Sequence, residues 1–150
     1  MNGLNGGGAP ADAPVDMDGD GWTDWAVVRN VGGGPNGQLR WFYNLNAGGD
    51  TVVLDWGLAN DFVVPADYDG DGKDDVAIWR PGAAEEAAFY ILNSATMTVR
   101  VEAFGQTGDD PTVVGDYNGD GTDDIAVYRA GSPSYWFYRT TPGGAVTYTP

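Results

Sequence analysis

The sequence contains no cysteine and no histidine. A disulfide framework, a thiol nucleophile and the usual ligand sets for zinc, copper and haem are therefore excluded. Basic residues are scarce, with 7 Lys and Arg against 22 Asp and Glu, and the net charge is −15. Nucleic acids and anionic membranes attract basic surfaces, so we expect neither as a partner.

Long apolar runs are also missing. None approaches the roughly 20 residues of a membrane span, so we expect no membrane insertion. The start at Met1–Leu4 lacks the charged and apolar regions of a signal peptide. We expect an extracellular or cell-surface protein whose signal is not part of this sequence.

Glutamate is also scarce, since 19 of the 22 acidic residues are Asp. A merely solvated acidic surface uses Glu as freely as Asp. The short Asp side chain suits turns and hard cations, so the bias points to metal-binding loops.

An Asp- and Gly-rich segment of nine residues occurs three times, about 50 residues apart. The copies are Asp16–Asp24, Asp67–Asp75 and Asp116–Asp124. An apolar segment ending in Arg follows each copy, namely Trp25–Arg29, Val76–Arg80 and Ile125–Arg129. A Phe-Tyr pair then recurs, beginning at Phe42, Phe89 and Phe137.

A period near 50 residues with four short strands in each repeat is typical of β-propeller blades. We expect an all-β chain in which residues 1–150 form one propeller unit of three blades with antiparallel strands. The blades cover about 11–56, 62–104 and 111–150, after a linker at 1–10. Their opening strands are expected at Ala13–Val15, Phe62–Ala66 and Pro111–Gly115. The helix-like stretch Ala83–Ala88 is too short to be a stable helix, and we expect a loop there.

Three blades cannot close a ring, because propellers need about four to eight. The outer faces of the end blades are then apolar and open, which a monomer rarely tolerates. We expect a homo-oligomer, with a head-to-tail homodimer of six blades favoured. The alternatives are part of a larger propeller-containing protein and docking on another protein.

The acidic loops have the pattern of calcium sites, because calcium takes six to eight oxygen ligands. Positions 1, 3, 5 and 9 carry acidic or amide side chains, position 6 is a Gly that turns the backbone, and position 7 offers its carbonyl. We expect one Ca²⁺ in each blade, three in the chain. The predicted ligands are Asp16, Asp18, Asp20, Trp22 and Asp24; Asp67, Asp69, Asp71, Lys73 and Asp75; and Asp116, Asn118, Asp120, Thr122 and Asp124. The third site is expected to be weaker, since Asn118 is neutral.

An EF-hand shares this opening but needs Glu at position 12 and flanking helices. Position 12 is Val27, Ile78 or Val127, within strand-like sequence, so an EF-hand is excluded.

The segment Val64–Pro81, followed by Phe89–Leu92, resembles the bacterial FG-GAP/VCBS repeat, a family related to the integrin α-subunit propeller. The first repeat departs from it at Met17 and Trp25. The resemblance implies that the acidic loop joins the first two strands of a blade and holds calcium. It implies no single activity, since family members are adhesion modules, lectins and accessory domains of secreted enzymes and toxins.

We favour a non-enzymatic module for binding, adhesion or assembly that calcium stabilises. The first alternative is a carbohydrate-binding lectin, with Trp22, Trp41 and Trp136 as candidate stacking residues whose other role is packing. The second is an accessory domain of a secreted enzyme or toxin. The adjacent carboxylates Asp74–Asp75 and Asp123–Asp124 are candidates for general acid–base catalysis. Neighbouring strand residues point to opposite faces, however, so catalysis is not expected. Arg29, Arg80 and Arg129 are expected to pair with acidic loops or cap carbonyls.

Overall fold

The computed structural model describes residues 15–46 and 48–150. Over these residues the chain is all-β, as predicted, and contains ten strands and no helix. No described segment is therefore a helix that could span a membrane. The strands are β1 (Trp25–Asn30), β2 (Gln38–Asn44), β3 (Val52–Leu58), β4 (Phe62–Val63), β5 (Val76–Arg80), β6 (Ala88–Leu92), β7 (Val99–Ala103), β8 (Ile125–Arg129), β9 (Tyr135–Arg139) and β10 (Thr147–Thr149).

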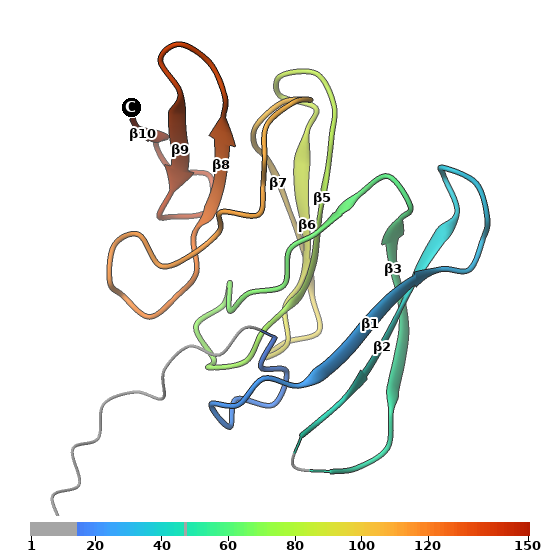
Figure 1. Ribbon diagram of the computed structural model, residues 1–150. Helices are drawn as coiled ribbons and strands as arrows, with labels where there is room; N and C mark the ends of the chain where they lie inside the picture. Colours follow the sequence, from blue (N-terminus) through green and yellow to red (C-terminus); the bar gives the residue numbers. More distant parts are fainter. Residues whose placement is uncertain (1–14, 47) are drawn as a thin grey trace, which may run out of the picture.

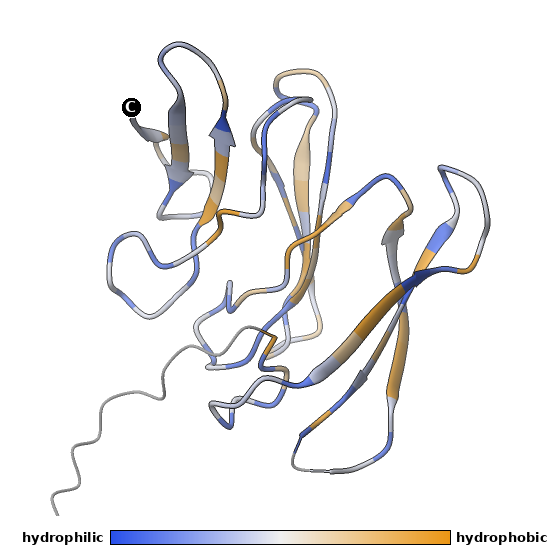
Figure 2. Cartoon of the chain, viewed as in Figure 1, coloured by the Kyte–Doolittle hydropathy of each residue, from blue (hydrophilic) through white to orange (hydrophobic). Residues whose placement is uncertain are grey.

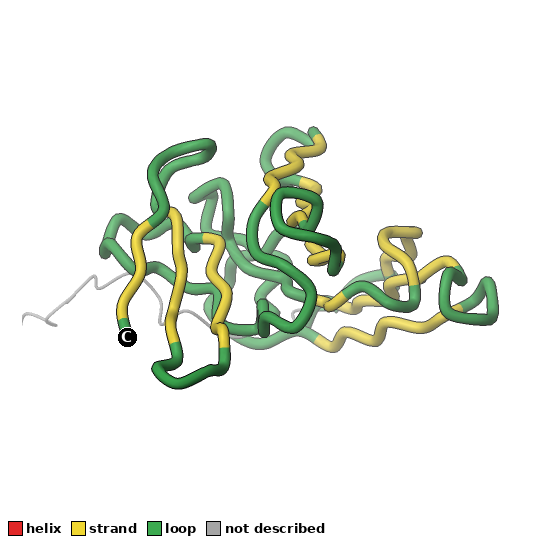
Figure 3. Tube along the Cα trace, turned by 90° about the horizontal axis from the view of Figure 1, so that it is seen from above, coloured by secondary structure: helices red, strands yellow, loops and turns green. Residues whose placement is uncertain are grey.

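The strands form three small antiparallel sheets that follow one another along the chain. The first sheet is β1-β2-β3, the second β4-β5-β6-β7 and the third β8-β9-β10. Figures 1 and 3 show them side by side in chain order, with the acidic loops together at one end. This arrangement is consistent with propeller blades.

Among the described residues, only the second sheet has the four strands predicted for each repeat. Its opening strand β4 ends at Val63 and is therefore shorter than the expected Phe62–Ala66. A single bridge between Ala66 and Asp75 resumes the pairing beyond it.

The strand predicted at Pro111–Gly115 is wrong. Two isolated bridges stand in its place, joining Asp110 to Tyr128 and Gly115 to Asp124. Pro111 has no N–H, and the amide and hydroxyl of Thr112 donate to the Asp110 carboxylate at 2.9 and 2.7 Å instead of to β8.

The strand predicted at Ala13–Val15 lies mostly outside the described residues. Val15 itself has a left-handed φ of 61°, and its carbonyl accepts the Asp24 amide at 2.8 Å. The stretch Ala83–Ala88 is a loop with a single turn, closed by the Ala87 amide on the Ala83 carbonyl at 3.0 Å.

Strand register corrects the alignment of the Phe-Tyr pairs. Val27, Ile78 and Val127 occupy the same loop-relative position, and they pair with Phe42, Tyr90 and Phe137 respectively. The equivalent triplets are therefore Trp41–Tyr43, Phe89–Ile91 and Trp136–Tyr138. The second Phe-Tyr pair therefore lies one residue earlier in its strand than the other two pairs. The sequence alone does not show this shift, because aromatic residues occupy both of the positions concerned.

The core consists of two layers, one in each gap between neighbouring sheets. Val76 and Ile78 of β5 pack with Trp41 of the first sheet, whereas Ala77 and Trp79 face the third sheet. We call the side of a sheet that meets the preceding sheet its leading face, and the opposite side its trailing face. The second sheet is thus covered on both faces, with Ala77 and Trp79 fully buried.

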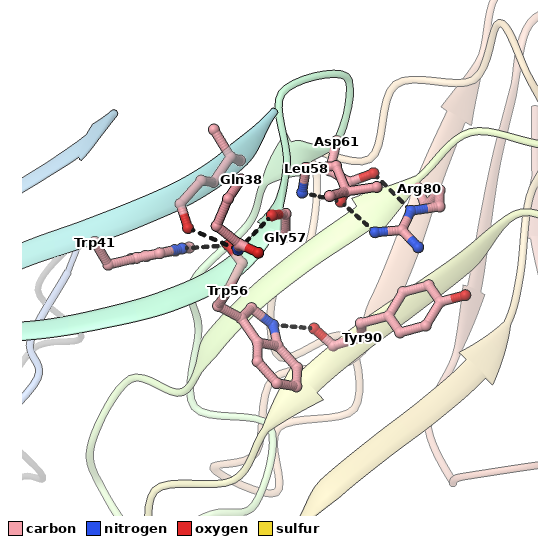
Figure 4. A network of polar contacts seen from close by, with 9 residues as sticks. Gln38, Trp41, Trp56, Gly57, Leu58, Asp61, Arg80 and Tyr90 are labelled. Carbon is pink, nitrogen blue, oxygen red and sulfur yellow. Dashed lines mark hydrogen bonds and ion pairs between the residues drawn. The ribbon is translucent and has the colours of Figure 1, made fainter. Parts of the chain in front are cut away.

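Polar contacts repeat at both gaps between sheets, and Figure 4 shows those between the first and second sheets. Arg80 of β5 makes two hydrogen bonds of 2.8 Å to Asp61, whose carboxylate also accepts the Leu58 amide at 2.7 Å. Arg129 of β8 pairs in the same way with Asp109, at 2.7 and 2.8 Å. Both arginines thus pair with an aspartate outside the acidic loops, whereas the sequence led us to expect the loops or backbone carbonyls as partners.

Candidate metal centre

Each acidic loop connects the opening segment of its repeat to the strand that follows, which is β1, β5 or β8. Glycine at position 6 has a positive φ in all three loops, as predicted, at 84°, 83° and 86° for Gly21, Gly72 and Gly121. Position 4 is also a left-handed Gly in each loop, at 77–78°. Two such turns within three residues curl the backbone around its own side chains.

The first Asp of each loop organises this curl by accepting backbone amides. Asp67 Oδ1 accepts from Gly70 at 2.7 Å and from Asp71 at 3.1 Å, while Oδ2 accepts from Gly72 at 2.8 Å. Asp16 and Asp116 accept the amides of the corresponding residues in their loops. A carboxylate has about four lone-pair sites, so each of these groups can still bind a cation.

Several of the predicted ligands converge. Carboxylate oxygens of Asp16, Asp18 and Asp24 lie within 4.8 Å of one another, and so do those of Asp67, Asp69 and Asp71. The fourth predicted carboxylate of each loop, Asp20 or Asp75, stands outside its group of three. All these donors are oxygens, which is the set that suits calcium.

The Asp at position 9 ties the loop to its own sheet. Asp75 Oδ2 accepts the Tyr68 amide at 3.1 Å, and Oδ1 accepts the Ser94 amide at 2.6 Å. Asp24 is held likewise by the amides of Met17 at 2.8 Å and Asn46 at 2.7 Å.

Sequence reasoning missed Asn46 and Ser94, which come from the turn between the last two strands of each sheet. The Asn46 Nδ2 group contacts Asp20 Oδ1 and the Trp22 carbonyl at 3.2 Å and Asp24 Oδ1 at 3.3 Å. Ser94 Oγ donates to Asp71 Oδ2 at 3.0 Å. A polar residue two places beyond the end of β2 and β6 was the available signal.

The Asn46 amide shows where an ion fits in the first loop. Its partly positive hydrogens draw together oxygens from positions 5, 7 and 9, including the position-7 carbonyl that was predicted to face the ion. A cation placed among these oxygens meets both carboxylate and carbonyl donors, so the residues fit a calcium ion.

The third loop is organised differently. The Asn118 side-chain amide donates to Asp120 Oδ2 at 2.9 Å, so an internal hydrogen bond occupies one predicted ligand. Asp124 Oδ2 accepts the Tyr117 amide at 3.0 Å. In the part of the chain that the structure describes, no residue of the β9–β10 turn holds Asp124 as Ser94 holds Asp75.

Charge crowding differs between the loops too. Burial raises the pKa of Asp75 to about 6, and the nearby charge of Asp69 adds to the shift. Burial also raises the pKa of Asp67. By contrast, the Gly121 amide lowers the pKa of Asp116. The second loop therefore holds its carboxylates at an electrostatic cost that a bound cation relieves.

Neighbouring loops are joined by the residue at position 8. The Asp74 amide donates to the Asp16 carbonyl at 2.7 Å, and the Asp16 amide donates to Asp74 Oδ2 at 2.9 Å. Asp123 makes the same pair of bonds with Asp67, at 2.7 and 3.0 Å. The adjacent carboxylates of the sequence thus divide their roles: position 9 serves its own loop and position 8 the loop before it.

Glycine at position 4 allows this close contact. A side chain at Gly19 would bring its Cβ within 2.6 Å of the Gly72 carbonyl oxygen in the next loop. The three loops therefore form one continuous row across the ends of the sheets.

The three tryptophans considered as sugar-stacking residues lie in different surroundings. Trp41 is 1% exposed and donates its Nε1 hydrogen to the Trp56 carbonyl at 2.9 Å, so it is a core residue. Trp136 is half-buried against Tyr128, with ring centroids 5.3 Å apart. Trp22 in the first loop is 72% exposed.

Comparison with known proteins identifies one part of this arrangement directly. Residues 112–148, which include the third acidic loop and all of β8 and β9, match the family model of the FG-GAP repeat. Searches of curated proteins and of solved structures gave no match. The matched segment carries the same loop-and-strand pattern as the two earlier repeats, and the resemblance to the FG-GAP repeat seen in the sequence is confirmed for residues 112–148.

Proposed function

We propose that this protein is a non-enzymatic β-propeller module that calcium stabilises and that serves binding, adhesion or assembly outside the cell. The observation that carries the proposal is the convergence of three carboxylates within 4.8 Å in each of the first two loops. Carboxylates this close repel one another, and a divalent cation with oxygen preference removes that repulsion.

Calcium would supply charge neutralisation and crosslink the ends of the sheets. In each loop the side chains at positions 1, 3, 5 and 9 and the carbonyl at position 7 would hold it. Because position 8 joins each loop to the one before it, ordering one loop supports its neighbour. The chain itself provides the rest of the framework through its two buried layers between sheets.

The first two loops are the stronger candidates. Both gather three carboxylates, whereas Asn118 of the third loop is neutral and bonds to Asp120. We expect three calcium ions per chain, with the third bound most weakly. Extracellular calcium modules bind with dissociation constants of about 10⁻⁴–10⁻³ M, a range that suits a location outside the cell.

Calorimetric titration and thermal unfolding, each with calcium and with a chelator, test this function. Free calcium at 100 times the dissociation constant should stabilise the fold by about 2.7 kcal/mol per site. Asp67→Ala should remove one site from the titration. Asp50→Asn is the matched control, because Asp50 is an exposed carboxylate outside the loops and should leave the stoichiometry unchanged.

Absence of heat on titration, together with identical melting in calcium and in chelator, would refute a calcium role. Magnesium distinguishes a specific site from general charge screening. It demands near-ideal octahedral geometry and loses its water reluctantly, so equal stabilisation by magnesium would argue against built calcium sites.

Glycan binding is a second candidate, and the exposure of Trp22 favours it. An indole ring beside a calcium loop offers an apolar face to a sugar ring. The test is a glycan array in calcium, with Trp22→Ala as the variant. Binding that survives this substitution would place any sugar site elsewhere.

A further inference from the structure

The end sheets of the chain each leave one face open, and the two faces differ from their internal equivalents. The leading faces of the second and third sheets bury Val76 and Ile78, and Ile125 and Val127, all at 5% exposure or less. Strand position makes Trp25 and Val27 their equivalents in the first sheet. These two are 77% and 55% exposed.

The leading face of the first sheet is nevertheless built like the internal ones. Arg29 lies over the Phe42 ring at 5.6 Å, as Arg80 lies over Tyr90 at 4.8 Å and Arg129 over Phe137 at 4.7 Å. Figure 2 shows the hydrophobic colour along β1 and β3, the two outer strands of this sheet. The face thus repeats an interface pattern but has no sheet in front of it among the described residues.

The trailing face of the third sheet has the pattern of the other side of such an interface. Tyr117 is equivalent to Tyr68 at position 2 of the acidic loop. Tyr68 is 1% exposed beneath the third sheet, whereas Tyr117 is 39% exposed and stacks on Tyr138 at 4.7 Å. Tyr128 and Trp136 continue this aromatic face at partial burial.

We propose that the leading face of the first sheet docks on the trailing face of the third sheet of a second copy of this chain. The contact continues an interface that the chain already makes twice, in which Val or Ile of a leading face meets aromatic residues of the trailing face before it. One molecule carries both halves, so a second copy provides what each end lacks. Two copies joined at both ends form a closed set of six sheets, since head-to-tail contacts close when the rotation permits.

Charge gives this association a distinctive dependence on conditions. Each copy carries −15, so two copies repel one another at long range, although the contact itself is mainly apolar. Screening at 0.15 M ionic strength limits this repulsion to about 8 Å. Salt should therefore strengthen the dimer, whereas it would weaken a complex held by opposite charges.

Sedimentation of the full chain in saturating calcium tests the proposal. The expected species has twice the chain mass of 15.8 kDa. Trp25→Glu places a charge on the leading face and should give the single-chain mass. Met97→Glu is the matched control: it adds the same charge at a 68% exposed apolar side chain on the turn between β6 and β7, and should leave the dimer intact.

A wild-type chain that stays monomeric at tens of micromolar in 0.15 M salt overturns the proposal. Equal effects of Trp25→Glu and Met97→Glu, with circular dichroism confirming folded protein, also overturn it. Val27→Lys provides a second variant of opposite charge that should dissociate the dimer as well. The inference relies on the proposed function only for its calcium-bound state, and calcium titration of monomeric Trp25→Glu checks that function separately.

Discussion

Strands β1 of the first sheet and β5 of the second each follow an acidic loop and carry apolar residues at the same positions. In β5 both faces are covered, and Val76, Ala77, Ile78 and Trp79 are all at most 5% exposed. In β1 the equivalent leading residues Trp25 and Val27 lie in solvent. A continuous apolar run is typical of a strand covered on both sides. The sequence of β1 therefore indicates a covered strand, and the difference between the two lies in the neighbour.

The arginines that end these strands make the same point. Arg80 and Asp61 form a two-point ion pair in which the carboxylate side chain is 2% exposed. Arg29 has no carboxylate partner within residues 15–46 and 48–150. The second sheet acquires its partner from the turn that follows β3, so an interface includes the connecting turn as well as the facing sheets.

Shortening a side chain on the leading face should give the largest difference in lost unfolding free energy between the first and second sheets. Ile78→Ala removes buried methyl groups and should cost about 3 kcal/mol of unfolding free energy. Val27→Ala in the exposed equivalent should cost less than about 1 kcal/mol. Urea unfolding at concentrations low enough for monomers measures both. Equal losses would mean that Val27 is covered within a single chain.

Removing the terminal arginine should have the next largest effect. Arg80→Ala leaves the buried Asp61 without its charged hydrogen-bond donor, and a loss of about 2 kcal/mol is expected. Arg29→Ala removes only a stacking contact on Phe42 and should cost about 0.5 kcal/mol. A double-mutant cycle with Asp61→Asn isolates the pair. Without coupling in that cycle, the ion pair would contribute nothing to the join between sheets.

Breaking the contact between the first two loops should have a smaller effect on the unfolding free energy. The effect should extend to calcium binding by the neighbouring loop. Asp74→Ala leaves the buried Asp16 amide without its acceptor and should cost about 1 kcal/mol. It should also weaken calcium in the first loop, although Asp74 belongs to the second repeat. Asp74→Asn keeps an acceptor oxygen and should restore most of both. Thr23→Ala at the exposed position 8 of the first loop is the control. Calorimetric titration would contradict the coupling if Asp74→Ala left first-loop affinity intact.

Much of the fold could be predicted because the same sequence pattern occurs three times in the chain. The acidic loops mark the start of the strand that follows each of them, and β5 and β8 have the bounds of the apolar segments seen in the sequence. The opening strand of each repeat could not be predicted from β-propensity alone. Regular pairing stops near Pro65 and Pro111, and the Thr112 amide turns back to Asp110. One residue decides between a strand and isolated bridges there.

The converging carboxylates of the candidate site were predictable from the sequence, but the residues that hold them in place were not. Spacing within a loop identifies Asp16, Asp67 and Asp116, because local turns determine where their oxygens point. Asn46 and Ser94 come from a turn about 20 residues away, and only strand pairing brings them to the loop. The role of Asp74 depends on the previous sheet. The repeat pattern of the sequence therefore does not predict the contacts between one repeat and the next.

The smallest expected effect concerns pH, and it distinguishes the empty second loop from the filled one. The pKa of Asp75 is raised from 3.8 to about 6, so the folded state without calcium binds this proton more tightly than the unfolded chain. The resulting stability is fully present below pH 3.8 and is lost as pH rises through about 6. In chelator, the melting temperature should rise slightly as pH falls from 7 to 5, and Asp75→Asn should remove that slope. In calcium the carboxylate is the binding form, so acidification should lower the melting temperature over the same range. The same slope with and without calcium would mean that Asp75 does not face the ion.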